Sequence, residues 1–222
     1  MKKIAVFGAG GFGREVKMLI DQLNAISMTY EFVGYFDDGV AIGTMVNGYP
    51  VLGGREELNA YAQPLCVAFA VGNPATKKKI IDNITNEKVS YPSLIHPNVL
   101  IGNDDVSIGE GCIICAGCII TINIAIGNFV ILNLGCTVGH DTVIEDYASF
   151  MPGVNISGEV RIKEGAYVGT GAKIINQLEI GRYTIVGAGA VVSKTLPDEC
   201  TAVGIPAKAI KFHNQVIEKT EN

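Results

Sequence analysis

The sequence contains no tryptophan, and only 18% of its 222 residues carry a charge, against 48% that are hydrophobic. A chain this apolar is not disordered, and its length allows one large domain or two small ones. The net charge is −5, so the chain lacks the basic surface that binding to a phosphate backbone requires. We therefore expect a packed globular protein that does not bind nucleic acid.

Basic residues are missing from the middle of the chain. Residues 89–160 contain no Lys or Arg and seven acidic side chains, whereas residues 161–222 contain eight basic and six acidic side chains. Two interpretations stay open: an anionic ligand near the C-terminal end, or an ordinary solvated surface. The stretch from Gly111 to Gly139 carries no charge at all and is long enough to cross a bilayer. Asparagines and glycines interrupt this stretch and its period is not helical, so we expect no membrane insertion.

Signals for secretion and for metal binding are weak. Met1-Lys2-Lys3 leads into only four apolar residues, which favours a cytoplasmic protein without a signal peptide. Cys112, Cys115 and Cys118 form a C-x-x-C-x-x-C motif, which resembles half of a metal site. No second Cys or His cluster accompanies it, and two of these cysteines fall where the repeat described next requires small inward residues. We expect structural core thiols and no metal.

Apolar residues recur at every sixth position from Ile108 to Val192, through fifteen successive repeats. Neither an α-helix nor a strand of period two explains this spacing. A chain that turns by about 120° every six residues does, because three short strands then form a coil of about 18 residues. Small residues four positions later fit the tight inner corners. The sequence predicts a left-handed parallel β-helix from about Ile95 to Val192, followed by a loop and a short tail that cap the open end.

Residues 1–90 have a different pattern, in which strands alternate with helices. We expect strands at 3–7, 30–36 and 66–71 and helices at 14–23 and 74–84. This alternation predicts a small Rossmann-like parallel α/β sheet. The domains are therefore residues 1–90, the Rossmann-like domain, and residues 91–222, the β-helix with a C-terminal cap.

A glycine-rich loop, G-x-G-x-x-G, joins the first strand to the first helix of this domain. Such a loop presents backbone N–H groups and a helix N-terminus to phosphate oxygens. Three interpretations are open: binding of NAD, a simple turn of the chain, or binding of a nucleotide sugar. In the last, Gly10 and Gly11 meet the diphosphate, and Asp37 or Asp38 meets the base or ribose.

Six motifs occur in order along the chain: Gly8-Ala-Gly-Gly-Phe-Gly13, Phe36-Asp-Asp38, Ala70-Val-Gly-Asn73, Leu94-Ile-His-Pro97, Gly139-His-Asp141 and Gly204-Ile-Pro-Ala-Lys208. With these motifs the whole chain resembles the bacterial sugar acetyltransferases that join a small Rossmann-like domain to a left-handed β-helix. That family includes N-acetyltransferases of UDP-linked 4-amino sugars (the bacillosamine pathway), of GDP-perosamine and of dTDP-linked amino sugars, and also sialic acid O-acetyltransferases. The resemblance implies a homotrimer that uses acetyl-CoA and a nucleotide-sugar substrate, with CoA between two subunits.

The resemblance also implies roles for individual residues. It makes His140 the catalytic base and Asp141 the acid that raises its basicity, and it places Asn133 close to the acceptor amine. The remaining positions comprise the nucleotide-sugar contacts Gly10, Gly11, Phe12, Asp37, Asp38 and Gly72, and the cofactor contacts Ser149, Thr170 and Ala188. Two of these depart from the family, because Ser149 and Phe12 stand where many members have histidines.

The residues themselves support general-base chemistry at one histidine. Among His96, His140 and His213, only His140 lies within the uninterrupted repeat, at an outward position beside Asp141. A solvated surface histidine is the alternative. Acetyl transfer to an amine needs a base and oxyanion donors, and direct transfer is favoured because Cys136, the nearest cysteine, points inward. Rival functions are sugar O-acetylation, a zinc-dependent hydrase that would need three converging histidines, and a non-catalytic scaffold.

Overall fold

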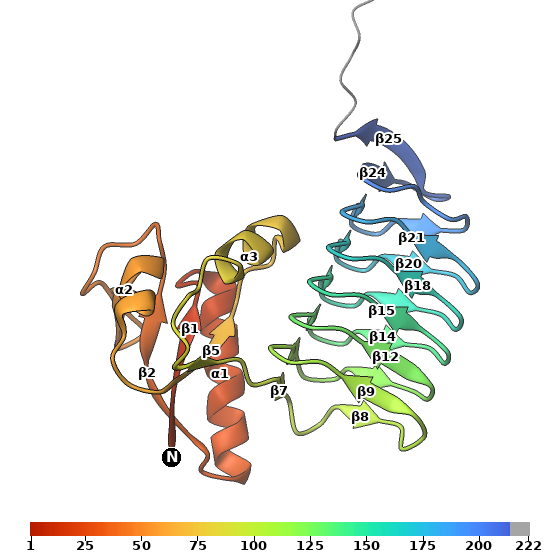
Figure 1. Ribbon diagram of the computed structural model, residues 1–222. Helices are drawn as coiled ribbons and strands as arrows, with labels where there is room; N and C mark the ends of the chain where they lie inside the picture. Colours follow the sequence, from red (N-terminus) through yellow and green to blue (C-terminus); the bar gives the residue numbers. More distant parts are fainter. Residues whose placement is uncertain (214–222) are drawn as a thin grey trace, which may run out of the picture.

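The computed structural model describes residues 1–213 and shows two units side by side, a small α/β domain and a β-helix (Figure 1). The α/β domain contains β1 (Lys2–Phe7), α1 (Gly11–Ile26), β2 (Tyr30–Phe36), β3 (Met45–Val46), β4 (Tyr49–Gly53), α2 (Arg55–Ala60), β5 (Leu65–Phe69), α3 (Pro74–Ile81) and β6 (Val89–Ser90). The strands form one sheet in the order β3-β4-β2-β1-β5-β6. All neighbours pair in parallel except β3 and β4. The predicted fold class of this domain is confirmed.

The predicted elements of this domain are present, with shifted ends. The first helix begins at Gly11, directly after the glycine loop, and it runs to Ile26 instead of ending at residue 23. The helix α3 ends at Ile81, three residues earlier than expected. The strands β3, β4 and β6 and the helix α2 were not predicted, because elements of two to six residues show little periodicity.

The β-helix is built from strands of two or three residues on three flat faces. Face 1 contains β7 (Leu94–Ile95), β10 (Ile113–Ile114), β13 (Ile131–Leu132), β16 (Ser149–Phe150), β19 (Tyr167–Val168) and β22 (Ile185–Val186). Face 2 contains β8 (Leu100–Ile101), β11 (Ile119–Ile120), β14 (Thr137–Val138), β17 (Asn155–Ile156), β20 (Lys173–Ile174) and β23 (Val191–Val192). Face 3 contains β9 (Val106–Ile108), β12 (Ile124–Ile126), β15 (Val143–Ile144), β18 (Arg161–Ile162) and β21 (Glu179–Ile180).

The strand register follows the predicted repeat. Leu132 pairs with Phe150, which lies three hexads further along the chain, whereas the step from Ile95 to its partner Ile114 is one residue longer because of the insertion before Ile108. The aliphatic side chains and the small corner residues line one continuous buried core inside the prism. All six cysteines are buried free thiols, as expected. The left-handed parallel β-helix is confirmed.

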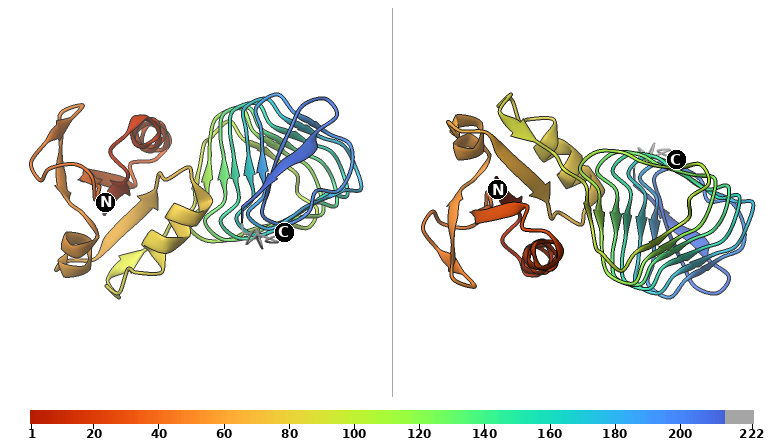
Figure 2. Two further views of the ribbon diagram at one scale, coloured as in Figure 1. Left: turned by 90° about the horizontal axis from the view of Figure 1, so that it is seen from above. Right: turned by 90° about the horizontal axis from the view of Figure 1, so that it is seen from below.

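The C-terminal end differs from the prediction of a loop and a tail. β24 (Cys200–Val203) continues face 1 by pairing in parallel with β22, and β25 (Lys208–Phe212) pairs antiparallel with β24. Seen along the helix axis, this hairpin lies across the open end of the coil (Figure 2). The expected tail falls at residues 214–222, outside the described residues.

Face 1 packs against the α/β domain through apolar side chains. Ile113 and Ile131 join Val16 and Leu19 of α1 in one cluster. The ring of Phe129 packs against Phe69 and Tyr91, and it stacks on Tyr147 with 5.6 Å between ring centroids. A buried hydrogen bond adds to this interface, because Nζ of Lys77 on α3 donates to Oγ of Ser149 on β16 at 3.0 Å. Within residues 1–213, no helix has the length and apolarity to cross a membrane.

Candidate active site

His140 lies at the corner between faces 2 and 3, after β14 and before β15. Its side chain is 57% exposed, and its Nδ1 lies 2.7 Å from Oδ2 of Asp141. The ionised carboxylate is an acceptor only, so it holds the tautomer with hydrogen on Nδ1 and leaves the Nε2 lone pair free. The hydrogen bond from His140, followed by one from Asn123, holds the pKa of Asp141 below its usual value. The pair therefore has the geometry of an oriented base.

The imidazole lies over the next coil of the β-helix. A Cβ atom added at Gly158 would lie only 2.5 Å from Cε1 and Nε2 of His140. Gly158 occupies the same position of the following coil that His140 occupies in its own. A side chain at position 158 would push the ring away. The imidazole can therefore lie over this coil only because the residue there is a glycine.

Asn133 lies away from His140 within the chain. It follows β13 at the corner between faces 1 and 2, whereas His140 follows β14 at the next corner. Asn133 is 5% exposed, and its Oδ1 accepts a hydrogen bond from the backbone N–H of Leu134 at 2.7 Å. The strand β14 separates the two residues, so the structure does not bring them together in one copy of the chain.

Two of the expected cofactor residues share the corner of Asn133. Thr170 and Ala188 are exposed there at equivalent positions of successive coils, so that they form one column along the helix axis. Ser149 differs, because its side chain is fully buried on face 1 and its hydroxyl accepts the hydrogen bond from Lys77. It has no exposed surface that a cofactor could contact in this structure.

The glycine loop is hydrogen-bonded to Asp37, the residue that follows β2. Oδ2 of Asp37 accepts a hydrogen bond from the backbone N–H of Ala9 at 2.8 Å, and Oδ1 accepts one from Gly39 at 2.9 Å. Gly10 precedes the first turn of α1, and an added Cβ there would meet no atom within 4 Å. The loop is therefore open on its outer side, while the carboxylate of Asp37 holds it in place.

The other residues expected at the nucleotide sugar differ in their surroundings. Gly11 is exposed at the start of α1, and the half-buried Phe12 packs against the core cluster of this domain. A Cβ added at Gly72 would lie 3.9 Å from Cε of Met151, at the corner between faces 1 and 2. Gly72 thus brings the carboxyl edge of the sheet close to the corner that also carries Asn133.

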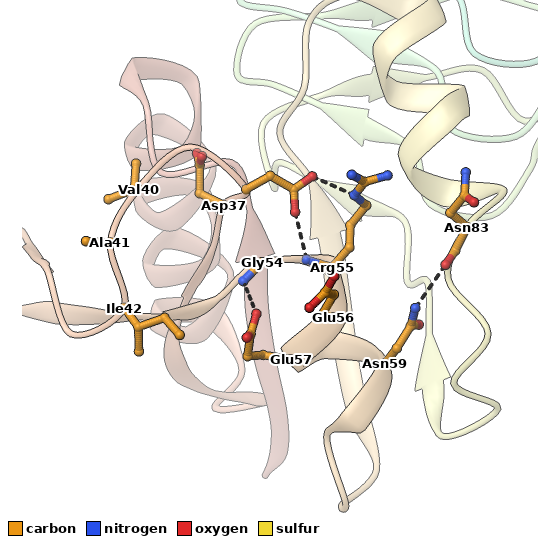
Figure 3. Close-up of a pocket in the computed structure, with 11 residues that line it drawn as sticks. Asp37, Val40, Ala41, Ile42, Gly54, Arg55, Glu56, Glu57, Asn59 and Asn83 are labelled. Carbon is orange, nitrogen blue, oxygen red and sulfur yellow. Dashed lines mark hydrogen bonds and ion pairs between the residues drawn. The ribbon is translucent and has the colours of Figure 1, made fainter.

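A pocket of about 600 Å³ opens beside Asp37 and Asp38 (Figure 3). Its other lining residues come from the loop after β2, from α2 and from the segment after α3. Asp38 holds Arg55 through both carboxylate oxygens, with Oδ1 2.8 Å from the backbone N and Oδ2 2.6 Å from Nε. The guanidinium nitrogens beyond Nε have no further partner among the interactions in Figure 3. The pocket therefore combines carboxylates with one cation that can receive an anionic or polar ligand.

Similar proteins identify the family. Residues 3–84 match the family described as "PglD N-terminal domain". The acetyltransferase domain of PglB from Neisseria gonorrhoeae, in complex with acetyl coenzyme A, is 34% identical with a TM-score of 0.84, covering 94% of this chain and 99% of that chain. PerB from Caulobacter crescentus, in complex with CoA and GDP-perosamine, is 31% identical with a TM-score of 0.83, covering 95% and 98%. The chain belongs to the sugar N-acetyltransferase family.

A curated member of this family aligns over a shorter segment. GDP-perosamine N-acetyltransferase from Escherichia coli O157:H7 is 34% identical over 114 residues, which are 51% of this chain and 51% of that protein. The match thus spans about half the length of the curated relative. Family membership confirms the resemblance that the six sequence motifs indicated. Among the residues that the structure describes, no group of three His, Cys, Asp or Glu side chains could hold a metal ion.

Sequence reasoning missed two features of this candidate site. Arg55 was not predicted, because the helix α2 that carries it has only six residues. The signal was present in Gly54 and Glu57, since the Glu57 carboxylate accepts a hydrogen bond from the Gly54 N–H at 2.7 Å and so begins that helix. Gly158 was also missed, because its relation to His140 becomes visible only when successive coils are aligned with each other.

Proposed function

We propose that this chain transfers the acetyl group of acetyl-CoA to the amine of a nucleotide-linked amino sugar, of the 4-amino-4,6-dideoxy type. The observation that carries the proposal is the His140–Asp141 pair on a β-helix of the sugar N-acetyltransferase family. Relatives support the two substrates, since one was solved with acetyl coenzyme A and another with CoA and GDP-perosamine.

The proposed reaction is a direct transfer. The amine nitrogen attacks the thioester carbonyl, Nε2 of His140 takes the amine proton, and the N–C bond forms. Asp141 stabilises the resulting imidazolium. The tetrahedral intermediate then collapses, the C–S bond breaks, and the imidazolium returns the proton to the thiolate. An acetyl-cysteine intermediate at Cys136 is disfavoured, because its hydrogen bond with Cys118 and its burial raise its pKa.

The arrangement of the corners favours sites that are shared between copies of the chain. His140 lies on one edge of face 2, whereas Asn133, Thr170 and Ala188 lie on the other edge. Face 2 also carries outward apolar side chains in its first coils, including Leu100, which is 65% exposed. A homotrimer closed around a threefold axis would cover these side chains and bring the two edges together. Light scattering should then give three times the chain mass of 23.5 kDa.

The nucleotide sugar would bind at the carboxyl edge of the α/β sheet. In this proposal the diphosphate meets Gly10 and Gly11, the sugar passes Phe12 and Gly72, and the base or ribose enters the pocket beside Asp37 and Asp38. The open glycine loop and the Arg55 side chain that lines the pocket support this placement. The cytoplasm is the proposed location, which agrees with six cysteines that are all free thiols.

The decisive experiment replaces the base. His140→Ala should leave the core intact and lower kcat by roughly 10²- to 10⁴-fold, measured as thiol release from acetyl-CoA with GDP-, UDP- and dTDP-linked amino sugars. Raising the pH should recover part of the loss, because more of the acceptor amine is then unprotonated. A hydroxyl acceptor would show almost no such recovery. His96→Ala is the matched control, since His96 also bonds a polar neighbour, Asn98, but lies on the first coil. Full kcat in His140→Ala at pH 7 would refute the assignment.

A further inference from the structure

Four polar residues form a column along the corner between faces 2 and 3. Each stands one coil after the one before it, and each has a left-handed backbone; they are Asn123 (φ 54°), Asp141 (φ 58°), Glu159 (φ 58°) and Gln177 (φ 60°). They are linked in pairs by hydrogen bonds from an amide to a carboxylate. Nδ2 of Asn123 donates to Oδ1 of Asp141 at 2.9 Å, and Nε2 of Gln177 donates to Oε2 of Glu159 at 3.1 Å. Only the first pair touches the base.

We propose that Asn123 is a positioning residue that orients His140 through Asp141. This inference rests on the proposed function of His140. The carboxylate of Asp141 is held from two sides, by the Asn123 amide on Oδ1 and by Nδ1 of His140 on Oδ2. A carboxylate that is fixed at both oxygens cannot rotate without losing one bond, so the imidazole plane is fixed with it.

The exposure of His140 and Asp141 makes the hydrogen bond from Asn123 important. The side chains of His140 and Asp141 are 57% and 48% exposed, so packing of neighbouring side chains does little to hold either of them. A single hydrogen bond between two solvated groups competes with water and constrains geometry poorly. The amide of Asn123 comes from the preceding coil, whose backbone is rigidly paired with the coil of Asp141: the N–H of Asp141 donates to the carbonyl of Ile122 at 3.1 Å. The rigid coil thereby orients the exposed base.

The backbone conformation explains why an asparagine fits here. Both Asn123 and Asp141 have a positive φ, in a region that Asn and Asp adopt more readily than most other residues. With both residues in the same backbone conformation in adjacent coils, the Asn123 amide lies within hydrogen-bond distance of the Asp141 carboxylate. The hydrogen bond to Asp141 therefore orients the imidazole on one side, and the missing side chain of Gly158 in the following coil leaves room for the ring on the other.

The first test removes the amide without straining the backbone. Asn123→Gly keeps the left-handed conformation, and Gln177→Gly removes the corresponding amide three coils further on as a matched control. We expect Asn123→Gly to lower kcat about 10-fold with little change in either KM, and Gln177→Gly to retain the kcat of the unmodified chain. In ¹⁵N spectra of the imidazole, Asn123→Gly should show a mixture of tautomers, whereas the control should keep hydrogen on Nδ1. An unchanged spectrum and kcat in Asn123→Gly would overturn the proposal.

The second test keeps the shape of the side chain at position 123 and changes its charge. Asn123→Asp places a second carboxylate against Asp141, which favours the imidazolium, so the acidic limb of the kcat profile should move to higher pH. An unmoved limb would show that the side chain at position 123 does not act on the imidazole. The ¹⁵N spectrum separates this inference from the proposed function. If His140→Ala keeps its activity while Asn123→Gly changes the tautomer, the base assignment fails and the positioning contact stands.

Discussion

Lys77 provides a prediction about stability that is independent of catalysis. Its side chain is 1% exposed at the interface between α3 and face 1, and the Ser149 hydroxyl accepts its hydrogen bond. Burial lowers the pKa of Lys77 from 10.5 to about 7, and the one charge interaction that opposes this effect is with Cys112. Burial in turn raises the pKa of the Cys112 thiol, so that this neighbour stays protonated and neutral near pH 7. A neutral amine is therefore the natural state of Lys77 above pH 7.

The sign of the pH effect follows from the proton count. Between pH 7 and about pH 10, the unfolded chain holds a proton on Lys77 that the folded chain has released. The free energy of unfolding should therefore rise with pH by about 1.4 kcal/mol per unit in this window, to a total of about 4 kcal/mol. The gain is complete above the unfolded pKa and is lost as the pH falls to about 7.

A double variant isolates this contribution. Lys77→Met keeps the length of the side chain but removes the amine, and Ser149→Ala removes the hydroxyl that would otherwise be buried without a donor. Lys79→Met is the control, because Lys79 is an exposed lysine on the same helix. Urea unfolding would be followed by circular dichroism between pH 6 and 10, since the chain has no tryptophan. The free energy of the unmodified chain minus that of the double variant should rise with pH. A flat difference would show that folded Lys77 keeps its proton, and would refute the reasoning from burial.

Two further predictions concern the site. Gly158→Ala should displace the imidazole of His140, because the new Cβ would lie 2.5 Å from the ring; steady-state kinetics should show a fall in kcat of about 10-fold or more, with KM for acetyl-CoA unchanged. Arg55→Met should weaken binding of a nucleoside diphosphate by about 10-fold in calorimetry, because the guanidinium charge at the pocket is lost while the stem of the side chain remains. Equal affinity in Arg55→Met would place the nucleotide outside the pocket.

The β-helix could be predicted because its sequence pattern and its geometry share one period. An aliphatic residue at every sixth position can be buried only if the chain turns at that spacing, so the sequence from Ile108 to Val192 determines the prism. The hairpin of β24 and β25 was not predicted, because it does not follow this period. Its strands pair with each other in antiparallel fashion, and their side chains no longer follow the inward position of the repeat.

The pocket of the α/β domain could not be predicted to the same extent. Asp37 and Asp38 were placed correctly at the end of β2, but sequence alone did not separate their tasks. The structure shows Asp37 bonded to the glycine loop and Asp38 bonded to Arg55. That division depends on the turn after β2 and on a six-residue helix, and neither has a sequence period.

The positions of Asn133 and His140 connect the fold to the assembly. Equivalent positions of successive coils are neighbours along the helix axis, whereas these two residues, which are little more than one hexad apart, lie on different corners. If both residues serve one acceptor amine, they must come from two copies of the chain. A mixture of His140→Ala and Asn133→Ala chains, co-expressed in equal amounts, should then regain activity, because about one quarter of the interfaces combine an intact His140 with an intact Asn133. Each variant alone should remain impaired. No recovery in mixed trimers would mean that the two residues do not act at one shared site.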